Sequence, residues 1–173
     1  MGDVVTMDDL TNDEIISILD CAERLVPVAK GEAHLPLLEG KVLANMFFEN
    51  STRTRMSFET AMKRLGGSVL NFSSVGTSVA KGETLYDTMK MIEGYSDVAA
   101  IRHPRQGAAQ YSADAVEIPI LNAGDGAGNH PTQTMLDLFT IRQAHGSLEG
   151  LNVVLVGDLR YGRTVHSLSH ALV

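Results

Sequence analysis

Residues 41–55 have the sequence KVLANMFFENSTRTR, in which an apolar run of strand length is followed at once by a densely polar segment. A run as apolar as residues 41–48 predicts a strand that helices cover on both faces, as in parallel sheets. Residues 51–55 then place three hydroxyls and two guanidiniums in five positions, which the packing of a strand or a helix does not require. An apolar helical pattern follows and stops at Gly66 and Gly67. The stretch predicts a strand, a polar turn and a helix.

The alternation of strand and helix continues along the rest of the chain. Apolar runs predict strands at residues 41–48, 68–72, 97–101, 118–121 and 151–156. Helical spacing of apolar residues predicts a first helix within 6–29 that begins near Thr11, and further helices at 56–65, 84–95, 106–115, 132–144 and from 163 onward. This order is typical of an α/β fold, with a parallel sheet flanked by helices and joined by right-handed crossovers.

Three polar stretches follow strands of the predicted sheet. The segment 51–55 follows the first strand, Arg102 follows the third, and a glycine-rich loop at 122–129 with His130 follows the fourth. In parallel α/β sheets, ligands bind just beyond the carboxyl ends of the strands. We therefore expect these three stretches to meet at one edge of the sheet and to form the binding site.

The pattern restarts after Gly146, with the strand predicted at 151–156 and one further helix. The apolar residues of that helix would have a bare face: Val165, Leu168 and Leu172. A single strand and helix cannot bury both of their faces. We therefore expect one domain over residues 1–146 and the beginning of a second, truncated α/β domain over 147–173.

Local clusters of cations in an acidic chain suggest a small anionic ligand rather than a polyanion, although composition alone favours the alternative of scattered solvated charges. The 173-residue chain has a formal charge of −7, which argues against nucleic acid or an anionic membrane as a partner. No apolar run reaches the roughly 18 residues of a membrane-spanning helix, and the acidic N-terminus lacks the features of a signal peptide. The single cysteine, Cys21, fits a reducing compartment and is predicted to lie in the core. The sequence predicts a cytoplasmic protein.

The polar turn after the first strand suits a phosphate. A helix N-terminus presents unpaired N–H groups and a partial positive charge, both of which favour an anion. Ser51, Thr52 and Thr54 add hydroxyl donors, and Arg53 adds a guanidinium that can hold two oxygens at once. The alternative is an ordinary helix cap, for which one Ser or Thr would be enough. Because five polar residues exceed what capping needs, we favour anion binding.

The second candidate site residue is His130. Pro131 is predicted to begin a helix, which places His130 at the cap of that helix and Gln133 in its first turn. A structural role is the alternative for a lone histidine, and we favour a functional one because of the neighbouring phosphate site. The glycine-rich loop at 122–129 lacks the spacing of a dinucleotide-binding loop, and no second His or Cys stands at metal-ligand spacing. No metal is therefore expected. On residue type alone, Lys81 is a solvated loop lysine.

Five segments, in order between residues 47 and 170, together resemble the catalytic chains of aspartate carbamoyltransferases. They are FFENSTRTRMSFETAMKRLGG, SVAKGETLYDT, IRHPRQGA, LNAGDGAGNHPTQTMLDLFTI and VGDLRYGRTVHSL. The STRTR segment and the His-Pro-x-Gln segment would also suit an ornithine carbamoyltransferase. The KGET, NAGDG and GDLRYGRTVHSL segments are more similar to the aspartate enzymes.

The resemblance implies an enzyme of pyrimidine biosynthesis that needs no cofactor. It would transfer the carbamoyl group of carbamoyl phosphate to L-aspartate, giving N-carbamoyl-L-aspartate and phosphate. By resemblance, the carbamoyl phosphate-binding residues are Ser51, Thr52, Arg53, Thr54, Ser78, Lys81, Arg102, His130 and Gln133. The catalytic residues among them would be Arg53, Thr54, Lys81, Arg102, His130 and Gln133, and Lys81 and Arg163 would bind aspartate.

The resemblance also implies roles and partners. Thr54, Arg102 and His130 would donate to the carbamoyl oxygen, and Gln133 would face the carbamoyl nitrogen. The family's catalytic unit is a homotrimer, in which Ser78 and Lys81 would reach into the site of a neighbouring subunit. A separate regulatory chain is left open. Two alternatives to the aspartate enzyme remain: a carbamoyl phosphate-binding fragment without turnover, and a carbamoyltransferase for another amine such as ornithine.

Overall fold

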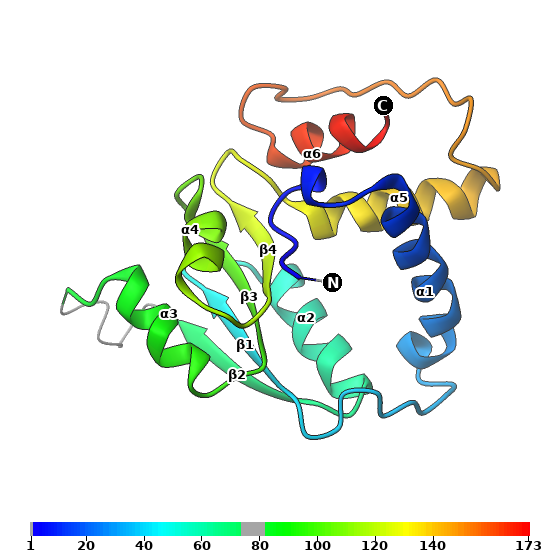
Figure 1. Ribbon diagram of the computed structural model, residues 1–173. Helices are drawn as coiled ribbons and strands as arrows, with labels where there is room; N and C mark the ends of the chain where they lie inside the picture. The colour runs from blue at the N-terminus through cyan, green and yellow to red at the C-terminus, as the bar shows by residue number, and fades with distance from the viewer. Residues whose placement is uncertain (1, 74–81) are drawn as a thin grey trace.

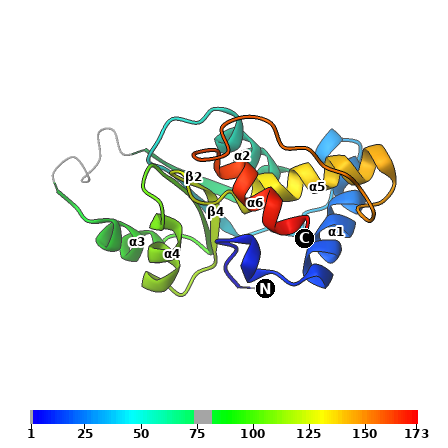
Figure 2. The same ribbon diagram turned by 90° about the horizontal axis from the view of Figure 1, so that it is seen from above.

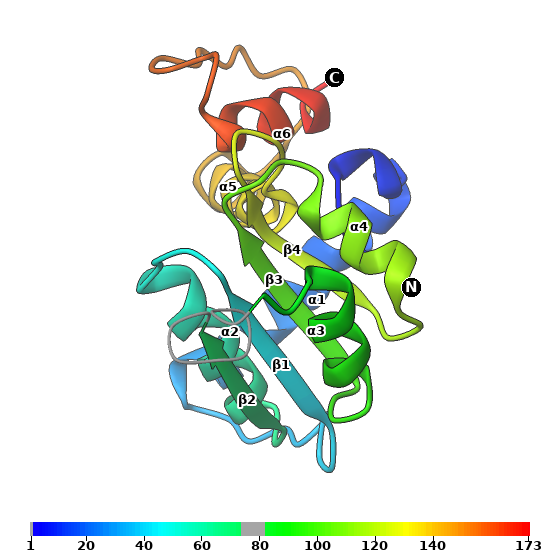
Figure 3. The same ribbon diagram turned by 90° about the vertical axis from the view of Figure 1, so that its left-hand side faces the viewer.

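Residues 2–73 and 82–173 are described by a computed structural model, and their centre is a four-stranded sheet in the order β2-β1-β3-β4 (Figure 3). The strands are β1 (Val42–Phe47), β2 (Ser68–Ser73), β3 (Val98–His103) and β4 (Ile120–Asp125). All three pairs of neighbouring strands are parallel. The α/β fold with a parallel sheet flanked by helices is therefore confirmed.

Helices cover both faces of the sheet, as Figure 2 shows from above. On one face lies α2 (Arg53–Arg64), and on the other lie α3 (Leu85–Glu93) and α4 (Ala108–Ala115). The remaining elements gather beyond β4 (Figure 1): the short 3-10 helix η1 (Met7–Asp9), α1 (Asn12–Lys30), α5 (Pro131–His145) and α6 (Arg163–Ala171). In the described ranges, no helix combines the length and the apolar character that crossing a membrane would take.

The strand β1 is buried on both faces, as its apolar sequence predicts. Ala44 and Met46 belong to the cluster formed with α3 and α4, whereas Leu43 packs on the opposite side against Met62 of α2. Because successive side chains of a strand point to opposite faces, one continuous apolar run supplies two separate cores. A third cluster joins α1 to α5 through Leu19 and Leu138.

Helix starts follow the predicted chemistry. Thr11 caps α1 reciprocally, since its hydroxyl accepts from the Glu14 N–H (3.3 Å) and its own N–H donates to the Glu14 carboxylate (2.9 Å). Pro131 occupies the first position of α5, with His130 as its cap. These contacts explain why both helices begin within a residue or two of the predicted positions.

Two strands extend beyond their predicted ends. The prediction that Arg102 follows a strand is wrong, because β3 continues to His103 and pairs Arg102 with Phe47 of β1. The loop predicted at 122–129 begins only after Asp125, where β4 ends. Backbone pairing with a neighbouring strand sets these ends, and hydropathy does not report it.

The strand predicted at 151–156 is wrong. This segment is irregular, and Val154 and Val156 are 82% and 90% exposed. A strand needs a backbone partner, and within the described ranges no segment pairs with this one. The helix that follows is present as α6, but its apolar face is not bare, because Leu168 and Leu172 pack against the cluster that contains Leu138.

The prediction of a core position for Cys21 is also wrong, since this side chain is exposed. The buried stripe of α1 contains Ile15, Leu19 and Val28. Two residues beyond Leu19 correspond to about 200° around the helix, which turns Cys21 away from that stripe.

Candidate functional site

The carboxyl edge of the sheet carries two arginines that share one carboxylate. Nε of Arg102 donates to Oε1 of Glu49 at 2.6 Å, and Nη2 of Arg163 donates to the same oxygen at 2.9 Å. Nη1 of Arg102 also lies 3.4 Å from the Thr54 hydroxyl, and Nη1 of Arg163 donates to the Gly126 carbonyl at 3.0 Å. Residues from β3, α2 and α6 therefore meet at a single point.

The electrostatics of this point are set by burial and by the two guanidiniums. Burial alone would raise the pKa of Glu49, but hydrogen bonds and charge from Arg163 and Arg102 outweigh it and hold that pKa below its usual value. Burial and the positive charge of Arg163 lower the pKa of Arg102. Two cations and one anion leave the point with a net positive charge, which favours an additional anion.

The backbone makes room for these side chains. Gly124 in β4 has φ +117°, and a Cβ at this position would lie 2.9 Å from the guanidinium carbon of Arg163. A residue with a side chain would meet both the strain of positive φ and a clash with the guanidinium. The first glycine of the glycine-rich sequence at 122–129 therefore admits an arginine, although this sequence does not have the spacing of a nucleotide-binding loop.

The polar turn before α2 does not act as an ordinary helix cap. Thr52 occupies the cap position, but its side chain makes no capping hydrogen bond in the part of the chain that the structure describes. Ser51 and Thr54 are partly buried, whereas Thr52 and Arg53 are exposed. The first N–H groups of α2 thus point to the sheet edge without a capping hydroxyl, as an anion site needs.

His130 is buried, with 5% of its surface exposed, at the cap of α5. Its backbone N–H donates to the Ser167 hydroxyl at 3.0 Å, and Nδ1 of its imidazole lies 3.3 Å from the Thr132 hydroxyl. Burial first, and then the charges of Arg163 and Arg102, lower the pKa of His130 to about 4. The imidazole is therefore neutral near pH 7 and can present an N–H without carrying charge.

The remaining predicted site residues are placed as follows. Gln133 lies in the first turn of α5, partly buried, and its Nε2 donates to Asp137 at 3.0 Å. Ser78 and Lys81 lie outside the described residues. The structure thus links Arg102 directly to Thr54 and, through Glu49, to Arg163, and it brings His130 within the field of both arginines.

Glu49 is the site residue that the sequence analysis missed. It stands between β1 and the polar turn, two residues before the segment 51–55 that was recognised as a site. A carboxylate is not expected among donors for an anion, so residue type argued against it. The available signal was an acidic side chain at the end of a buried strand, beside a cluster of cations.

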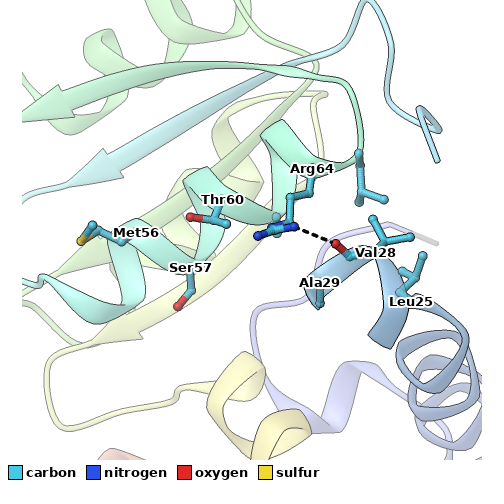
Figure 4. Close-up of a pocket in the computed structure, with 9 residues that line it drawn as sticks. Leu25, Val28, Ala29, Met56, Ser57, Thr60 and Arg64 are labelled. Carbon is cyan, nitrogen blue, oxygen red and sulfur yellow. Dashed lines mark hydrogen bonds between the residues drawn. The ribbon is translucent and has the colours of Figure 1, made fainter. Parts of the chain in front are cut away.

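A different concave feature lies between α1 and α2, where a groove of about 400 Å³ is lined largely by apolar side chains (Figure 4). Its one cation, Arg64, donates from Nη1 to the Val28 carbonyl at 3.1 Å and so ties α2 to α1. Apart from Arg64, the hydroxyls of Ser57 and Thr60 are the side-chain donors in its lining, so it offers an anion far fewer donors than the sheet edge. Among the described residues, no three His, Cys, Asp or Glu side chains gather as a metal site would require.

The fold and this edge define an α/β domain with clustered arginines at the carboxyl ends of a parallel sheet. Residues 2–143 match the family model of the aspartate/ornithine carbamoyltransferase carbamoyl-P binding domain, and the chain belongs to this family. The resemblance seen in the sequence motifs is thereby confirmed.

Curated relatives and solved structures agree with this membership. The chain is 54% identical to an aspartate carbamoyltransferase catalytic subunit from Archaeoglobus fulgidus over 99% of its length, and 56% identical to one from Thermococcus onnurineus over 98%. An aspartate transcarbamoylase from Trypanosoma cruzi in complex with carbamoyl aspartate and phosphate superposes with a TM-score of 0.95 at 43% identity, over 99% of this chain and 55% of that one. The catalytic subunit of M. Jannaschii aspartate transcarbamoylase superposes with a TM-score of 0.92 at 51% identity, over 99% of this chain and 56% of that one.

The chain spans a little over half of the length of these relatives. It covers 58% of the Archaeoglobus protein and 55% of the Thermococcus protein.

The lowered pKa of His130 predicts a specific dependence of stability on pH. Between pH 6.5 and about 4, the unfolded chain binds a proton at this histidine and the folded chain does not. The contribution of His130 to the free energy of unfolding is therefore complete above pH 6.5 and is lost as the pH falls toward 4. We expect His130→Gln to reduce the slope in this interval by up to about 1.4 kcal/mol per pH unit.

Urea unfolding at a series of pH values measures this slope. His145→Gln, an exposed substitution at the other end of α5, is the matched control and should leave the slope unchanged. Equal slopes for His130→Gln and the unaltered protein would show that the imidazole is not held neutral.

The shared carboxylate predicts an effect on anion affinity. An anion at this edge must compete with Glu49 for the two guanidiniums. Glu49→Gln keeps the shape and removes the competing charge, so we expect inorganic phosphate to bind about fivefold more tightly, as about 1 kcal/mol of relieved repulsion implies. Calorimetric titration measures the affinity, with Glu32→Gln, at an exposed position just beyond the end of α1, as the control for net charge. Equal tightening in both variants, or none in Glu49→Gln, would contradict a competing role for Glu49.

Proposed function

We propose that this chain binds carbamoyl phosphate at the carboxyl edge of its sheet and serves as that part of an aspartate carbamoyltransferase. The reaction is transfer of the carbamoyl group to the amine of L-aspartate, giving N-carbamoyl-L-aspartate and phosphate. The observation that carries the proposal is the pair of arginines, Arg102 and Arg163, held beside the uncapped start of α2. Family membership supplies the identity of the anion.

The phosphate is assigned to the start of α2 and to β3. Ser51, Thr52, Arg53 and Thr54 lie on consecutive positions of the turn and the first helical residues, and Arg102 lies 3.4 Å from the Thr54 hydroxyl. Helix N–H groups, hydroxyls and guanidinium forks are the groups that recognise phosphate most readily in proteins. This convergence supports a leaving phosphate that is stabilised as it departs.

The carbamoyl group is assigned to donors that surround the same edge. Attack of an amine on the carbamoyl carbon builds negative charge on the carbamoyl oxygen. Thr54, Arg102 and His130 would donate to that oxygen, and Gln133 would face the nitrogen. Preorganised donors of this kind are worth about 3 kcal/mol each in other enzymes. The neutral state of His130 supports its assignment as an N–H donor, and the chemistry requires neither a covalent nucleophile nor a cofactor.

The second substrate is assigned to Arg163 and Lys81, which would hold carboxylates of aspartate. Arg163 begins α6 and reaches the edge through Glu49, which supports its proximity to the carbamoyl group. Solved relatives from Trypanosoma cruzi are complexes with carbamoyl phosphate and aspartate, and these names support the same pair of substrates here. The proposed division is a carbamoyl phosphate-binding domain at 1–146 and the start of an aspartate-binding domain at 147–173.

The oligomeric state and the cellular location are proposed from the same family membership. We assign the chain to a homotrimer with sites shared between subunits, in which Ser78 and Lys81 serve a neighbouring site. The enzyme would act in the cytoplasm, in pyrimidine biosynthesis, and a regulatory chain remains an additional candidate partner. The support is the naming of the relatives as catalytic subunits, which implies assembly with other chains.

The enzymatic alternative is transfer to ornithine, since the matching family model covers both aspartate and ornithine enzymes. The curated relatives at 51–56% identity are aspartate enzymes, which favours aspartate. A carbamoyl phosphate-binding fragment without turnover is the alternative outside the enzymes. This alternative has the same anion site as the enzyme but does not use a second substrate.

Arg53 should be needed for the anion and not for the fold. Its side chain is exposed at the first position of α2, so Arg53→Ala removes a charge-assisted donor and opens no cavity in the core. We expect the affinity for carbamoyl phosphate to fall at least about tenfold, with an unchanged melting temperature. Calorimetric titration measures the affinity, and Arg24→Ala on the exposed side of α1 is the matched control. If the Arg53→Ala protein is folded and binds carbamoyl phosphate as tightly as the unaltered chain, the phosphate does not bind at this turn.

Turnover separates the three candidate functions. Aspartate carries two carboxylates, and this chain offers Arg163 and Lys81 to hold them. The chain covers 58% of the Archaeoglobus relative, and we propose that the uncovered part supplies further contacts to aspartate. Lost partners for one carboxylate cost several kcal/mol in a buried site, or about a thousandfold in rate. We expect the 173-residue chain to form carbamoyl-aspartate about a thousandfold more slowly than its Archaeoglobus relative, and to form no citrulline from ornithine. Parallel assays with the two amines measure this, and efficient carbamoylation of ornithine would reject the aspartate assignment.

A further inference from the structure

A polar side chain lies in the apolar layer between the sheet and α2. Asn45, in the middle of β1, is fully buried, on the same face of the sheet as Leu43. That face forms an apolar cluster in which Leu43, Met62 and Ala100 are buried. An apolar side chain of the same size would suit this layer. The contacts of the amide must therefore explain why a polar side chain is present.

The amide of Asn45 connects β1 to two points of α2. Its Nδ2 donates to the Arg55 carbonyl at 3.1 Å and to Oδ1 of Asn71 at 3.1 Å. Asn71 is the register partner of Asn45 on the neighbouring strand β2, and its own Nδ2 donates to Glu59 at 3.0 Å. The two asparagines therefore hold α2 by the backbone of its first turn and by a side chain one turn later.

This arrangement is not optimised for stability. Among the described residues, Oδ1 of Asn45 has no hydrogen-bond partner although it is buried. A buried carbonyl without a partner loses its hydration and gains nothing in return. The position therefore keeps a polar side chain at a cost to stability, which is characteristic of residues that serve a site.

The hydrogen bond of Asn45 to α2 constrains the helix in a way that apolar contacts do not. Apolar contacts of α2 with the sheet, such as those of Phe58 and Met62, hold the helix down but allow it to slide and rotate by small amounts. Hydrogen bonds depend steeply on distance and angle, so the bond to the Arg55 carbonyl fixes the first turn of α2. That turn carries Arg53 and Thr54, and Thr54 lies 3.4 Å from Arg102.

We propose that Asn45 is a positioning residue for the anion site, which sets the rotation and the height of the start of α2 against Arg102 on β3. The proposal rests on the proposed function, in which this turn receives the phosphate of carbamoyl phosphate. Asn45 touches no substrate; it acts through the Arg55 carbonyl and, with Asn71, through Glu59. Small displacements of binding groups have large effects on affinity and rate. Accurate placement of the first turn of α2 can therefore outweigh the loss of stability that a buried polar side chain causes.

The variant Asn45→Leu tests this directly. Leucine branches at the same carbon and fits the surrounding apolar layer, so the core stays filled while both hydrogen bonds are lost. We expect the melting temperature to stay the same or rise. The affinity for inorganic phosphate and for carbamoyl phosphate should fall about tenfold, the change expected for one or two lost hydrogen bonds. A purely structural role predicts the opposite, a loss of stability with unchanged affinity.

Leu43→Val is the matched control, because it lies two residues earlier on the same face of β1 and makes no side-chain hydrogen bond. It should lower the melting temperature and leave both affinities unchanged. Asn71→Ala removes the hydrogen bond to Glu59, which is the second link to α2. Because Asn71 is exposed, this substitution leaves the apolar core intact. It should weaken binding less than Asn45→Leu.

Amide hydrogen exchange supplies a readout that needs no ligand. In Asn45→Leu, exchange should become faster at the first hydrogen-bonded N–H groups of α2, which begin with Met56, and stay unchanged in its last turn and in α5. If the unaltered chain binds neither phosphate nor carbamoyl phosphate, the proposed function fails, and local exchange alone decides whether Asn45 places the helix. If the unaltered chain binds both ligands and Asn45→Leu matches it in affinity and exchange, the positioning role is overturned.

Discussion

The site depends on one carboxylate that two guanidiniums share. Arg102 and Arg163 come from β3 and α6, and Glu49 joins their guanidiniums at the edge of the sheet. Bonds of 2.6 and 2.9 Å to one oxygen bring the cations together before any anion arrives. The same contacts hold the start of α6 against the sheet. A cationic site of this kind is preorganised, and its residual positive charge remains available to a ligand.

The neighbouring histidine shows how the same cations tune a group that they do not contact. Burial at the cap of α5 disfavours the charged imidazole, and the field of Arg163 and Arg102 disfavours it further, so the pKa of His130 falls to about 4. A neutral imidazole can donate one N–H without adding to the positive charge of the arginines. The edge therefore holds two kinds of donor side by side, the fixed charges of the arginines and a neutral imidazole.

Much of the fold could be predicted because it is encoded locally. Apolar runs and helical spacing identified β1, α2, α3 and α5, and Thr11 and Pro131 marked where two helices begin. Features that depend on a neighbour could not be predicted in this way. Arg102 lies inside β3 because β1 extends the ladder, and residues 151–156 are irregular despite a strand-like sequence because they have no pairing partner within the described ranges.

The same distinction applies to the site. Residue types that prefer anions made the turn at 51–55 recognisable, and the order of strands brought it to the edge where Arg102 lies. Glu49 and Asn45 were missed because neither has the chemistry of an anion ligand. Both contact the residue types that do or the turn that carries them, since Glu49 accepts hydrogen bonds from two arginines and Asn45 donates to the backbone of the turn that carries Arg53 and Thr54. The groups that contact a ligand can be identified by residue type, whereas the groups that orient them are identified only by the contacts they make.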